Sequence, residues 1–251
     1  MIKRPPAPDA RLRAAMELCG PVDAFADIGA DHGRLSACML LSGQARRALV
    51  ADVSAEALAK ARRLMGAHGL EKQAVFAVAD GLDALDALPG RVDAAFVLGM
   101  GGDTISGILS RGRQRLEGMT LILGAQTELY LLRRALCSVG YRVRAERVVA
   151  QGRYAYVLMR AEPALPGEAA HTEAECLLGP CLMHQMPREW LPVLSRRELL
   201  LRRGIEAMTA AGLDKDRERL ERFRMEHEAA KRYLEVMRQR YAEEEREHES
   251  P

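Results

Sequence analysis

Acidic side chains follow three short apolar segments of the sequence. Asp27 stands in the segment AFADI, Asp52 ends RALVAD, and Asp80 follows AVFAVA. If these segments are parallel strands, their carboxyl ends meet at one edge of the sheet, where open α/β folds bind their ligands. A fourth aspartate, Asp31, lies in the turn directly after the first segment. Carboxylates gathered at one edge favour a ligand that carries positive charge.

The turn after the first segment, DIGADHG, differs from the turn of a dinucleotide-binding site. Such a site needs the spacing G-x-G-x-x-G, so that the backbone can approach a pyrophosphate. Here only Gly29 and Gly33 remain, and Asp31 between them would repel phosphates. The ammonium and sulfonium groups of S-adenosylmethionine suit this turn, while Asp52 can accept hydrogen bonds from the ribose hydroxyls and Asp80 one from the adenine amino group. The sequence therefore predicts an S-adenosylmethionine site, which we assign to Asp27, Gly29, Asp31, Asp52, Val53, Asp80, Gly81, Leu82 and Gly99.

Three of these aspartates also have ordinary structural interpretations. Asp31 could cap the helix that follows it, and Asp52 could cap a helix that begins near Ser54. Asp80 could be a turn residue. Acids at three successive strand ends favour the cofactor site over three independent structural roles.

A run of glycines surrounds Met100 in the segment VLGMGGDTI, residues 97–105. The backbone there is not covered by side chains, and it lies at the carboxyl end of an expected strand, next to the expected position of the methyl group. Its N–H and C=O groups can hydrogen-bond the edge of a flat base. A tight turn from strand to helix would explain two of the glycines without any function. We assign Met100, Gly101 and Gly102 to the substrate.

The sequence predicts an alternation of strands and helices. Apolar, β-branched segments that alternate with helical patterns are typical of a parallel sheet covered on both faces. Two further strands, 141–151 and 153–161, are joined at Gln151-Gly152, so the last strand must insert antiparallel. The other expected strands are 23–28, 47–53, 74–79, 92–99 and 120–125; the expected helices are 9–19, 33–42, 54–69, 103–112 and 127–140, with Asp9 and Ser54 as N-caps, and 80–90 is an expected loop.

The composition changes beyond a Pro- and Gly-rich stretch at residues 162–180, and from about Arg188 the chain is charged and helical. Apolar residues there recur at spacings of three and four, which is typical of a coiled-coil seam. Gly212 permits an antiparallel helical hairpin. We predict a Rossmann-like class I methyltransferase domain with a terminal antiparallel β-hairpin (1–162), followed by a linker and a C-terminal α-helical coiled-coil hairpin (163–251). The two apolar stripes are Leu194, Leu201, Ile205, Met208 and Ala211, and Leu220, Phe223, His227, Ala230, Leu234, Met237 and Tyr241.

The composition excludes several classes of protein. With a net charge of +2, any basic surface for nucleic acid must be local. No apolar run has the length of about eighteen residues that a membrane span needs, and the N-terminus lacks the apolar core of a signal peptide, so we expect a cytoplasmic protein. Five scattered cysteines fit reduced thiols. We expect no metal, because the spacing of the nearest candidates matches no zinc pattern; these are His171, Cys176, Cys181 and His184.

The chain resembles the TrmK family of bacterial tRNA methyltransferases, which methylate N1 of adenine 22 in tRNA. DIG-x-DH followed by GMGG is a specific pair of motifs, and with the helical tail the resemblance covers nearly the entire chain. It implies S-adenosylmethionine as cofactor and tRNA as partner. One departure is Gln126-Thr127, where relatives often have Gln-Pro. The matching segments are ADIGADHGRL (26–35), LGMGG (98–102), LILGAQTE (121–128), GRYAYVLM (152–159) and LLGPCLM (177–183).

Methylation of adenine N1 requires few protein groups. The N1 lone pair attacks the methyl carbon, and the cationic product loses a proton from N6. The enzyme must extrude the base, align N1 and exclude water. A carboxylate near N6 would stabilise the developing charge. We therefore assign Asp31 as the catalytic candidate and His32 as a second, although a histidine in a turn often only bonds nearby backbone.

Clusters of basic residues are candidates for contacts with RNA phosphates, although charged helix faces are usually only solvated. We assign Arg4 and Arg111 to the substrate. At 4% aromatic residues the chain offers no stacking platform, so we expect a folded RNA to be recognised by its shape. The clusters are Lys3, Arg4, Arg11 and Arg13; Arg111, Arg113 and Arg115; and Arg196, Arg197, Arg202 and Arg203.

Two other functions remain open at this point. A small-molecule methyltransferase with the same cofactor site would have an apolar lid over its pocket. A non-catalytic scaffold would use the coiled coil for assembly, but the intact Asp27, Asp52 and Asp80 argue against it. The sequence leaves open the oligomeric state, the set of tRNAs, and whether the coiled coil contacts RNA or only stabilises the protein.

Overall fold

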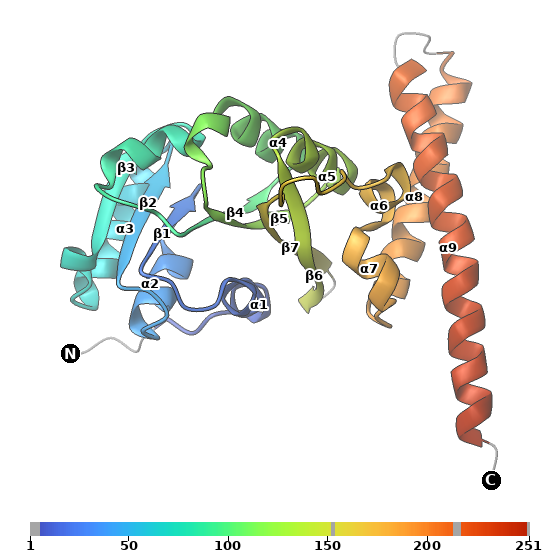
Figure 1. The fold of residues 1–251 in the computed structure, drawn as a ribbon, viewed down its shortest axis with the longest axis horizontal. Helices are drawn as coiled ribbons and strands as arrows, with labels where there is room; N and C mark the ends of the chain where they lie inside the picture. Colours follow the sequence, from blue (N-terminus) through green and yellow to red (C-terminus); the bar gives the residue numbers. More distant parts are fainter. Residues whose placement is uncertain (1–5, 152–153, 213–216, 250–251) are drawn as a thin grey trace. The chain divides into compact units, whose positions relative to one another are not determined.

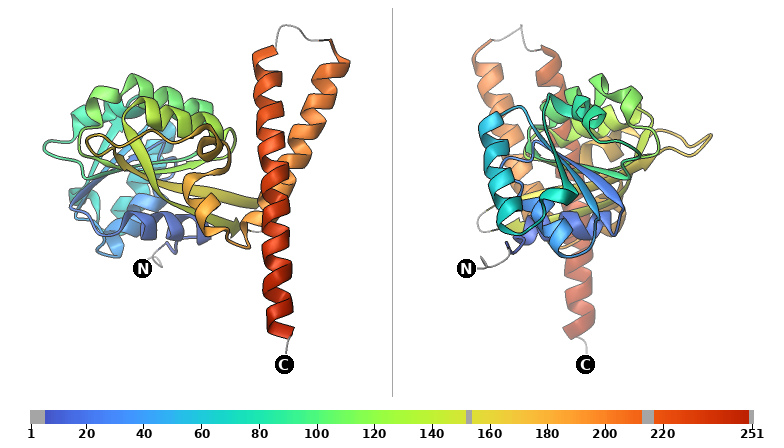
Figure 2. Two further views of the ribbon diagram at one scale, coloured as in Figure 1. Left: turned by 45° about the vertical axis from the view of Figure 1, so that its right-hand side comes forward. Right: turned by 90° about the vertical axis from the view of Figure 1, so that its left-hand side faces the viewer.

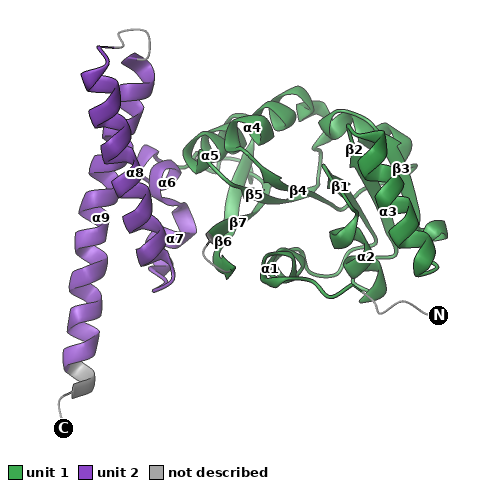
Figure 3. Cartoon of the chain, turned by 180° about the vertical axis from the view of Figure 1, so that it is seen from behind, with its two compact units in different colours: residues 1–171 green, residues 172–251 purple. Residues whose placement is uncertain are grey.

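The computed structural model describes residues 6–151, 154–212 and 217–249. The chain divides into two compact units, Met1–His171 and Thr172–Pro251, coloured green and purple in Figure 3. Of the residues singled out in the sequence, Lys3, Arg4 and Gly152 lie outside the described residues.

The first unit is built on one mixed sheet of seven strands in the order β3-β2-β1-β4-β5-β7-β6. Neighbours among β1 to β5 are parallel, whereas β7 is antiparallel to both β5 and β6. The strand order reverses between β1 and β4, and at such a switch point open α/β sheets bind ligands. The strands are β1 (Ala24–Ile28), β2 (Arg47–Asp52), β3 (Ala74–Val78), β4 (Ala94–Met100), β5 (Thr120–Ala125), β6 (Tyr141–Gln151) and β7 (Tyr154–Pro163).

The central strands carry near-continuous apolar residues, and the structure buries them. All five residues of β1 are buried, as are the middle four of β2. Such burial on both faces is expected for parallel strands that helices cover on each side. Phe25 of β1 and Phe96 of β4 meet edge to face, with ring centroids 5.6 Å apart. Asp27 is the polar exception among the buried residues of β1.

Helices cover both faces of this sheet (Figures 1 and 2). Helices α1 to α3 pack into one apolar cluster with the sheet, and α4 and α5 lie on the opposite face. Both expected N-caps are confirmed, because Asp9 accepts a hydrogen bond from the Leu12 N–H (2.9 Å) and Ser54 accepts one from the Ala57 N–H (3.2 Å). The helices are α1 (Ala10–Cys19), α2 (Arg34–Leu41), α3 (Ala55–Ala67), α4 (Gly102–Arg111) and α5 (Leu129–Ser138), with short 3₁₀ helices at Glu71–Gln73 and Arg113–Arg115.

The segment 80–90, expected to be a loop, contains the 3₁₀ helix η2 (Gly81–Ala87). Leu82, Leu85 and Leu88 recur every three residues, which is the period at which the side chains of a 3₁₀ helix align. Leu82 and Leu88 are buried. The apolar period therefore explains why the loop prediction was wrong here.

The second unit contains four helices in its described residues: α6 (Glu173–Leu178), α7 (Pro180–Gln185), α8 (Trp190–Ala210) and α9 (Arg217–Glu249). Helix α6 lies in the stretch expected to be a linker. Thr172 and Glu175 form a capping box at its start, and Pro180 occupies the first turn of α7. These local signals are enough to form two short helices in a stretch rich in Pro and Gly.

Helices α8 and α9 contact one another along their apolar residues. Arg197 on α8 donates to both carboxylate oxygens of Glu226 on α9, at 2.6 and 2.9 Å, and the Glu226 side chain is buried. Arg197 belongs to a cluster of candidates for contacts with RNA phosphates, but here its guanidinium is engaged in neutralising a buried carboxylate. The apolar residues buried in α8 and α9 include Leu194, Leu201, Ala230, Leu234, Met237 and Tyr241.

Gly102 lies where α4 closely approaches the turn that precedes α5. Its N–H donates to the carbonyl oxygen of Thr127 at 2.9 Å. A Cβ on Gly102 would lie 2.6 Å from that oxygen and closer still to the carbonyl oxygen of Glu128. This packing explains why a glycine is needed at Gly102, a residue that the sequence analysis assigned to the substrate.

We expect Gly102→Ala to destabilise the protein by about 1–3 kcal/mol, because backbone carbonyls cannot move away as a flexible side chain can. A matched control is Gly101→Ala: Gly101 has φ −68°, and its Cβ would lie 3.3 Å from the Thr127 hydroxyl. Thermal unfolding should show a clearly lower Tm for Gly102→Ala and a nearly unchanged Tm for the control. Equal Tm values for both variants would contradict this account.

Candidate active site

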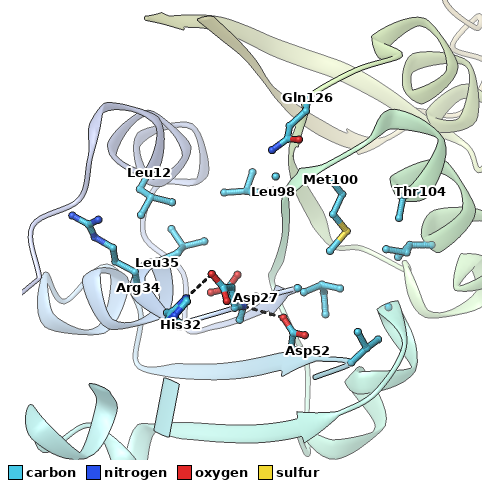
Figure 4. A pocket seen from close by; sticks show the side chains of 18 of the residues that line it. Leu12, Asp27, His32, Arg34, Leu35, Asp52, Leu98, Met100, Thr104 and Gln126 are labelled. Atoms are coloured by element: carbon cyan, nitrogen blue, oxygen red, sulfur yellow. Dashed lines mark hydrogen bonds and ion pairs between the residues drawn. The ribbon is translucent and has the colours of Figure 1, made fainter. Parts of the chain in front are cut away.

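A cavity of about 840 Å³ lies at the carboxyl ends of the central strands. Figure 4 shows its wall, with Asp27, His32 and Asp52 on one side and Leu98, Met100, Thr104 and Gln126 on the other. Its size is within the usual range for small-molecule sites. Of the residues assigned from the sequence, the cavity is lined by Asp27, Gly29, Asp31, His32, Asp52, Val53, Asp80, Gly81, Gly99 and Met100.

Asp52 is held at the end of β2 by two backbone groups. Its Oδ2 accepts a hydrogen bond from the Asp31 N–H at 3.0 Å, and its Oδ1 accepts one from the Ser54 N–H at 2.9 Å. Asp31 can donate in this way because its backbone is left-handed, with φ 48°. The cap of α3 is the Ser54 side chain, so Asp52 is not the helix cap that the structural alternative required. Each oxygen of Asp52 keeps acceptor capacity for a ligand.

Asp27 is buried within β1, and Ser36 of α2 donates its hydroxyl to the carboxylate at 2.6 Å. Burial disfavours the charged form and raises the pKa of Asp27 from 3.8 to about 6, although the hydrogen bond from Ser36 opposes this rise. The negative charge of Asp52 raises the pKa further. A cationic ligand nearby would favour the ionised form.

Asp31 and His32 form an exposed pair in the turn between β1 and α2. The Asp31 Oδ2 lies 2.5 Å from the His32 Nδ1. Helix α2 begins with Gly33 as its N-cap residue and has no side-chain cap, so Asp31 does not cap it. Both side chains line the cavity and are available to a ligand.

Asp80 lines the cavity beyond β3 and is paired with Arg111 of α4. The Arg111 Nη2 donates to both oxygens of Asp80, at 3.2 and 3.0 Å. Arg111 does not line the cavity. It was expected to bind substrate, but the structure places it on Asp80, where it holds the carboxylate at the cavity edge.

The glycines beside Met100 differ from one another in their surroundings. Met100 extends across the cavity (Figure 4), and its methyl group contacts Gly29 so closely that a Cβ there would collide with it. Gly29 has φ +73° and Gly99 φ +83°, which favour glycine. Gly101 and Gly102 do not line the cavity. Neither does Leu82, which is buried and packs beneath Gly112.

Several cavity residues were missed or given another role in the sequence analysis. Leu98 and Thr104 lie in the glycine-rich segment 97–105, and Gln126 lies in the motif GAQTE directly after β5, but none of them was assigned to the site; Ile108 had no signal beyond an ordinary helix pattern. Two arginines of the N-terminal helices also face the cavity. In the sequence, Arg11 belongs to a basic cluster expected to contact RNA, and Arg34 stands at an ordinary helix start.

Among the described residues, no group of three or more His, Cys, Asp or Glu side chains could hold a metal ion. His171, one of the candidates tested in the sequence, accepts a hydrogen bond from the Val143 N–H at 3.0 Å through its Nε2. In the part of the chain that the structure describes, we find no helix with the length and apolar character of a membrane span.

A family model matches most of the chain. Residues 25–228 match the TrmK family, described as tRNA (adenine(22)-N(1))-methyltransferase. The protein of that name from Bacillus subtilis is 28% identical over 153 residues, which are 61% of this chain and 63% of the relative.

Solved structures of the same family share the fold. The B. subtilis m1A22 tRNA methyltransferase TrmK superposes with a TM-score of 0.78 and 23% identity, over 91% of this chain and 99% of that one. M. capricolum TrmK in complex with S-adenosyl-homocysteine gives a TM-score of 0.74 and 18% identity, over 92% and 99%. The match over residues 25–228 is decisive: the chain belongs to the TrmK family of tRNA (adenine(22)-N(1))-methyltransferases.

Proposed function

We propose that this chain transfers a methyl group from S-adenosylmethionine to N1 of adenine 22 in tRNA, and that the cavity of the first unit is the active site. The observation that carries the proposal is the Asp52 carboxylate, fixed by two backbone N–H groups at the end of β2, the strand next to β1. Family membership supplies the reaction and the substrate. A tRNA substrate also favours the cytoplasmic location expected from the sequence.

The donor set of the cavity fits the adenosine part of the cofactor. We assign Asp52 to the ribose hydroxyls, since a carboxylate is a two-point acceptor. Val53 follows it, with 68% of its surface exposed, and offers an apolar face to the adenine ring beside Gly81. Asp80, held by Arg111, accepts from the adenine amino group.

The amino-acid end of the cofactor is assigned to the centre of the sheet. Asp27 supplies a buried negative charge for the ammonium group, and Gly29 and Gly99 line the cavity near it. The residues of this end therefore favour a positively charged ligand over a phosphate.

S-adenosylmethionine would supply an electrophilic methyl group: the N1 lone pair of adenine would form a bond to the methyl carbon as the carbon–sulfur bond breaks, and S-adenosylhomocysteine would leave. Asp31, exposed at the cavity, stabilises the positive charge that develops on the base and accepts the proton from N6. His32 orients the Asp31 carboxylate through the contact at 2.5 Å. Met100 and Leu98 line the cavity wall opposite Asp27, and their apolar side chains exclude water from the reacting atoms.

We propose that the second unit is a coiled-coil hairpin of α8 and α9 which binds tRNA through α8. Arg202 and Arg203 are exposed on α8. Arg196 is exposed too, whereas Arg197 is engaged by Glu226. Binding of RNA phosphates requires such free cations, and each contact makes the affinity depend on salt.

The reaction is tested with unmodified tRNA that carries adenine at position 22, the full-length protein and labelled S-adenosylmethionine, followed by nucleoside analysis. We expect 1-methyladenosine in this tRNA and none when position 22 is guanine. Asp52→Ala should abolish S-adenosylhomocysteine binding in calorimetry and methylation together. If the guanine-22 transcript is methylated at another adenine, the assignment of the reaction to position 22 is wrong. If neither RNA is labelled, the alternative of a small-molecule methyltransferase is favoured.

Asp31→Asn should lower the rate of methyl transfer by about a hundredfold, because the charge that it stabilises exists mainly in the transition state. Single-turnover kinetics with saturating cofactor measures this rate. The affinities for tRNA and S-adenosylhomocysteine are measured in parallel. If cofactor affinity falls as much as the rate, Asp31 is a cofactor ligand only.

The raised pKa of Asp27 predicts that stability and cofactor binding both depend on pH. Because its pKa is raised from 3.8 to about 6 in the folded protein, the free energy of unfolding falls as the pH rises from about 4 to about 6. Over the same range the affinity for S-adenosylhomocysteine should rise, since ionised Asp27 attracts the ammonium group. In Asp27→Asn the contribution of this residue to both slopes should vanish. The same titration of His32→Gln distinguishes any contribution of the His32 imidazole from that of Asp27. If Asp27→Asn keeps the wild-type pH slopes of stability and cofactor affinity, the assignment of these slopes to Asp27 is wrong.

The double variant Arg202→Ala, Arg203→Ala should weaken tRNA binding and reduce its salt slope by about 0.7–0.9 for each phosphate that is no longer neutralised, with an unchanged Tm. Arg197→Ala is the matched control on the same helix. It should lower the Tm, because it leaves the buried Glu226 carboxylate without its partner. Titration of each variant with tRNA at two salt concentrations measures the salt dependence of the affinity. If the double variant keeps the wild-type salt slope, α8 has only a structural role.

A further inference from the structure

Arg11 brings a guanidinium group to the cavity from the first turn of α1. The side chain is half-buried, and its guanidinium carbon lies 5.3 Å from the centroid of the Tyr156 ring. A Cβ on Gly99 would lie 3.4 Å from the Arg11 Nη1, so the guanidinium reaches the end of β4. Within the described residues, Arg11 forms no hydrogen bond or ion pair; its donors are free for a ligand.

The other arginines near the cavity are already engaged. Arg34 also lines it, but its Nη2 donates to the carbonyl oxygen of Ala7 at 2.6 Å. Arg111 is paired with Asp80. Arg11 therefore differs from both in having a stacked, half-buried guanidinium with unused donors.

The order of the strands places Arg11 at one end of a row of acidic groups. Across β3, β2, β1 and β4 the cavity presents Asp80, Asp52, Asp27 and then Gly99 with Arg11 beside it. β4 pairs with β1 in the register Ile28 to Val97, so Gly99 lies level with the turn that follows β1. A ligand that extends across the strand ends from β3 to β4 therefore lies beside three carboxylates and then beside the Arg11 cation.

This row matches the sequence of groups along S-adenosylmethionine. In the proposed site, Asp80 beyond β3 accepts from the adenine, Asp52 of β2 accepts from the ribose, and Asp27 of β1 supplies negative charge to the cationic centre. The α-carboxylate at the far end would be repelled by those acids and needs a cation. A guanidinium is suited to it, because its planar fork matches the two oxygens of a carboxylate.

We propose that Arg11 binds the α-carboxylate of the amino-acid end of S-adenosylmethionine, and this inference rests on the proposed function. Stacking on Tyr156 holds the guanidinium in place and limits its reach beyond the cavity. A contact to an RNA phosphate would instead favour an exposed arginine on the outer surface, such as Arg13 on the same helix.

Calorimetry tests the proposal with S-adenosylhomocysteine, its decarboxylated analogue and 5′-methylthioadenosine, which lacks the whole amino-acid end. We expect the wild type to bind the decarboxylated analogue about tenfold or more weakly than S-adenosylhomocysteine, which is the usual effect of losing a hydrogen bond to a charged group. Arg11→Met should bind S-adenosylhomocysteine more weakly by a similar factor and should no longer distinguish the two ligands. The control Arg13→Met should retain the wild-type cofactor affinities.

Binding of 5′-methylthioadenosine, unchanged in Arg11→Met, shows that the variant is folded and that its adenosine site is intact. If the affinity of Arg11→Met falls by the same factor for all three ligands, Arg11 only shapes the cavity and the proposal is wrong. If Arg11→Met keeps its preference for S-adenosylhomocysteine and binds tRNA more weakly, the guanidinium contacts a phosphate and the proposal is also wrong. Failure of the wild type to bind S-adenosylhomocysteine at all would instead refute the proposed function.

Discussion

The hydrogen bond from the Asp31 N–H to the Asp52 carboxylate connects the turn after β1 with the end of β2. It requires a left-handed backbone at Asp31, with φ 48°, between two glycines that also have positive φ. The bond fixes which way Asp52 faces and leaves the Asp31 side chain at the cavity. Since β1 lies between β2 and β4, the same turn also determines how Gly29 meets Met100. The candidate site is thus assembled around one backbone donor.

Charge placement gives this site its selectivity. The acids at the strand ends favour a cationic ligand and exclude a pyrophosphate. Elsewhere, several arginines that suggest RNA binding in the sequence are neutralised by neighbouring acids: Arg111 by Asp80, Arg115 by Asp86 and Arg197 by Glu226. An arginine is therefore a good candidate for a ligand only where the fold leaves its guanidinium without such a neighbour, as it does for Arg11.

Local patterns in the sequence predicted much of the first unit. The strands β1 to β5 and the caps at Asp9 and Ser54 follow from apolar runs and capping residues, and the acids at the strand ends follow from where those runs stop. What could not be predicted depends on contacts between distant segments. Gly102 looked like a substrate contact, but its need for glycine comes from the carbonyl groups before α5. Arg11 looked like one member of a basic cluster, and only the fold brings it to Gly99.

In the proposed complex the acidic strand ends bind S-adenosylmethionine with the ribose at Asp52. A crystal structure of the full chain with S-adenosylhomocysteine tests it most directly. We expect both ribose hydroxyls within about 2.7 Å of the Asp52 oxygens, with the Asp31 N–H still bonded to Asp52 and the adenine beside Val53. A ligand bound outside this cavity, or one whose ribose does not contact Asp52, would contradict it.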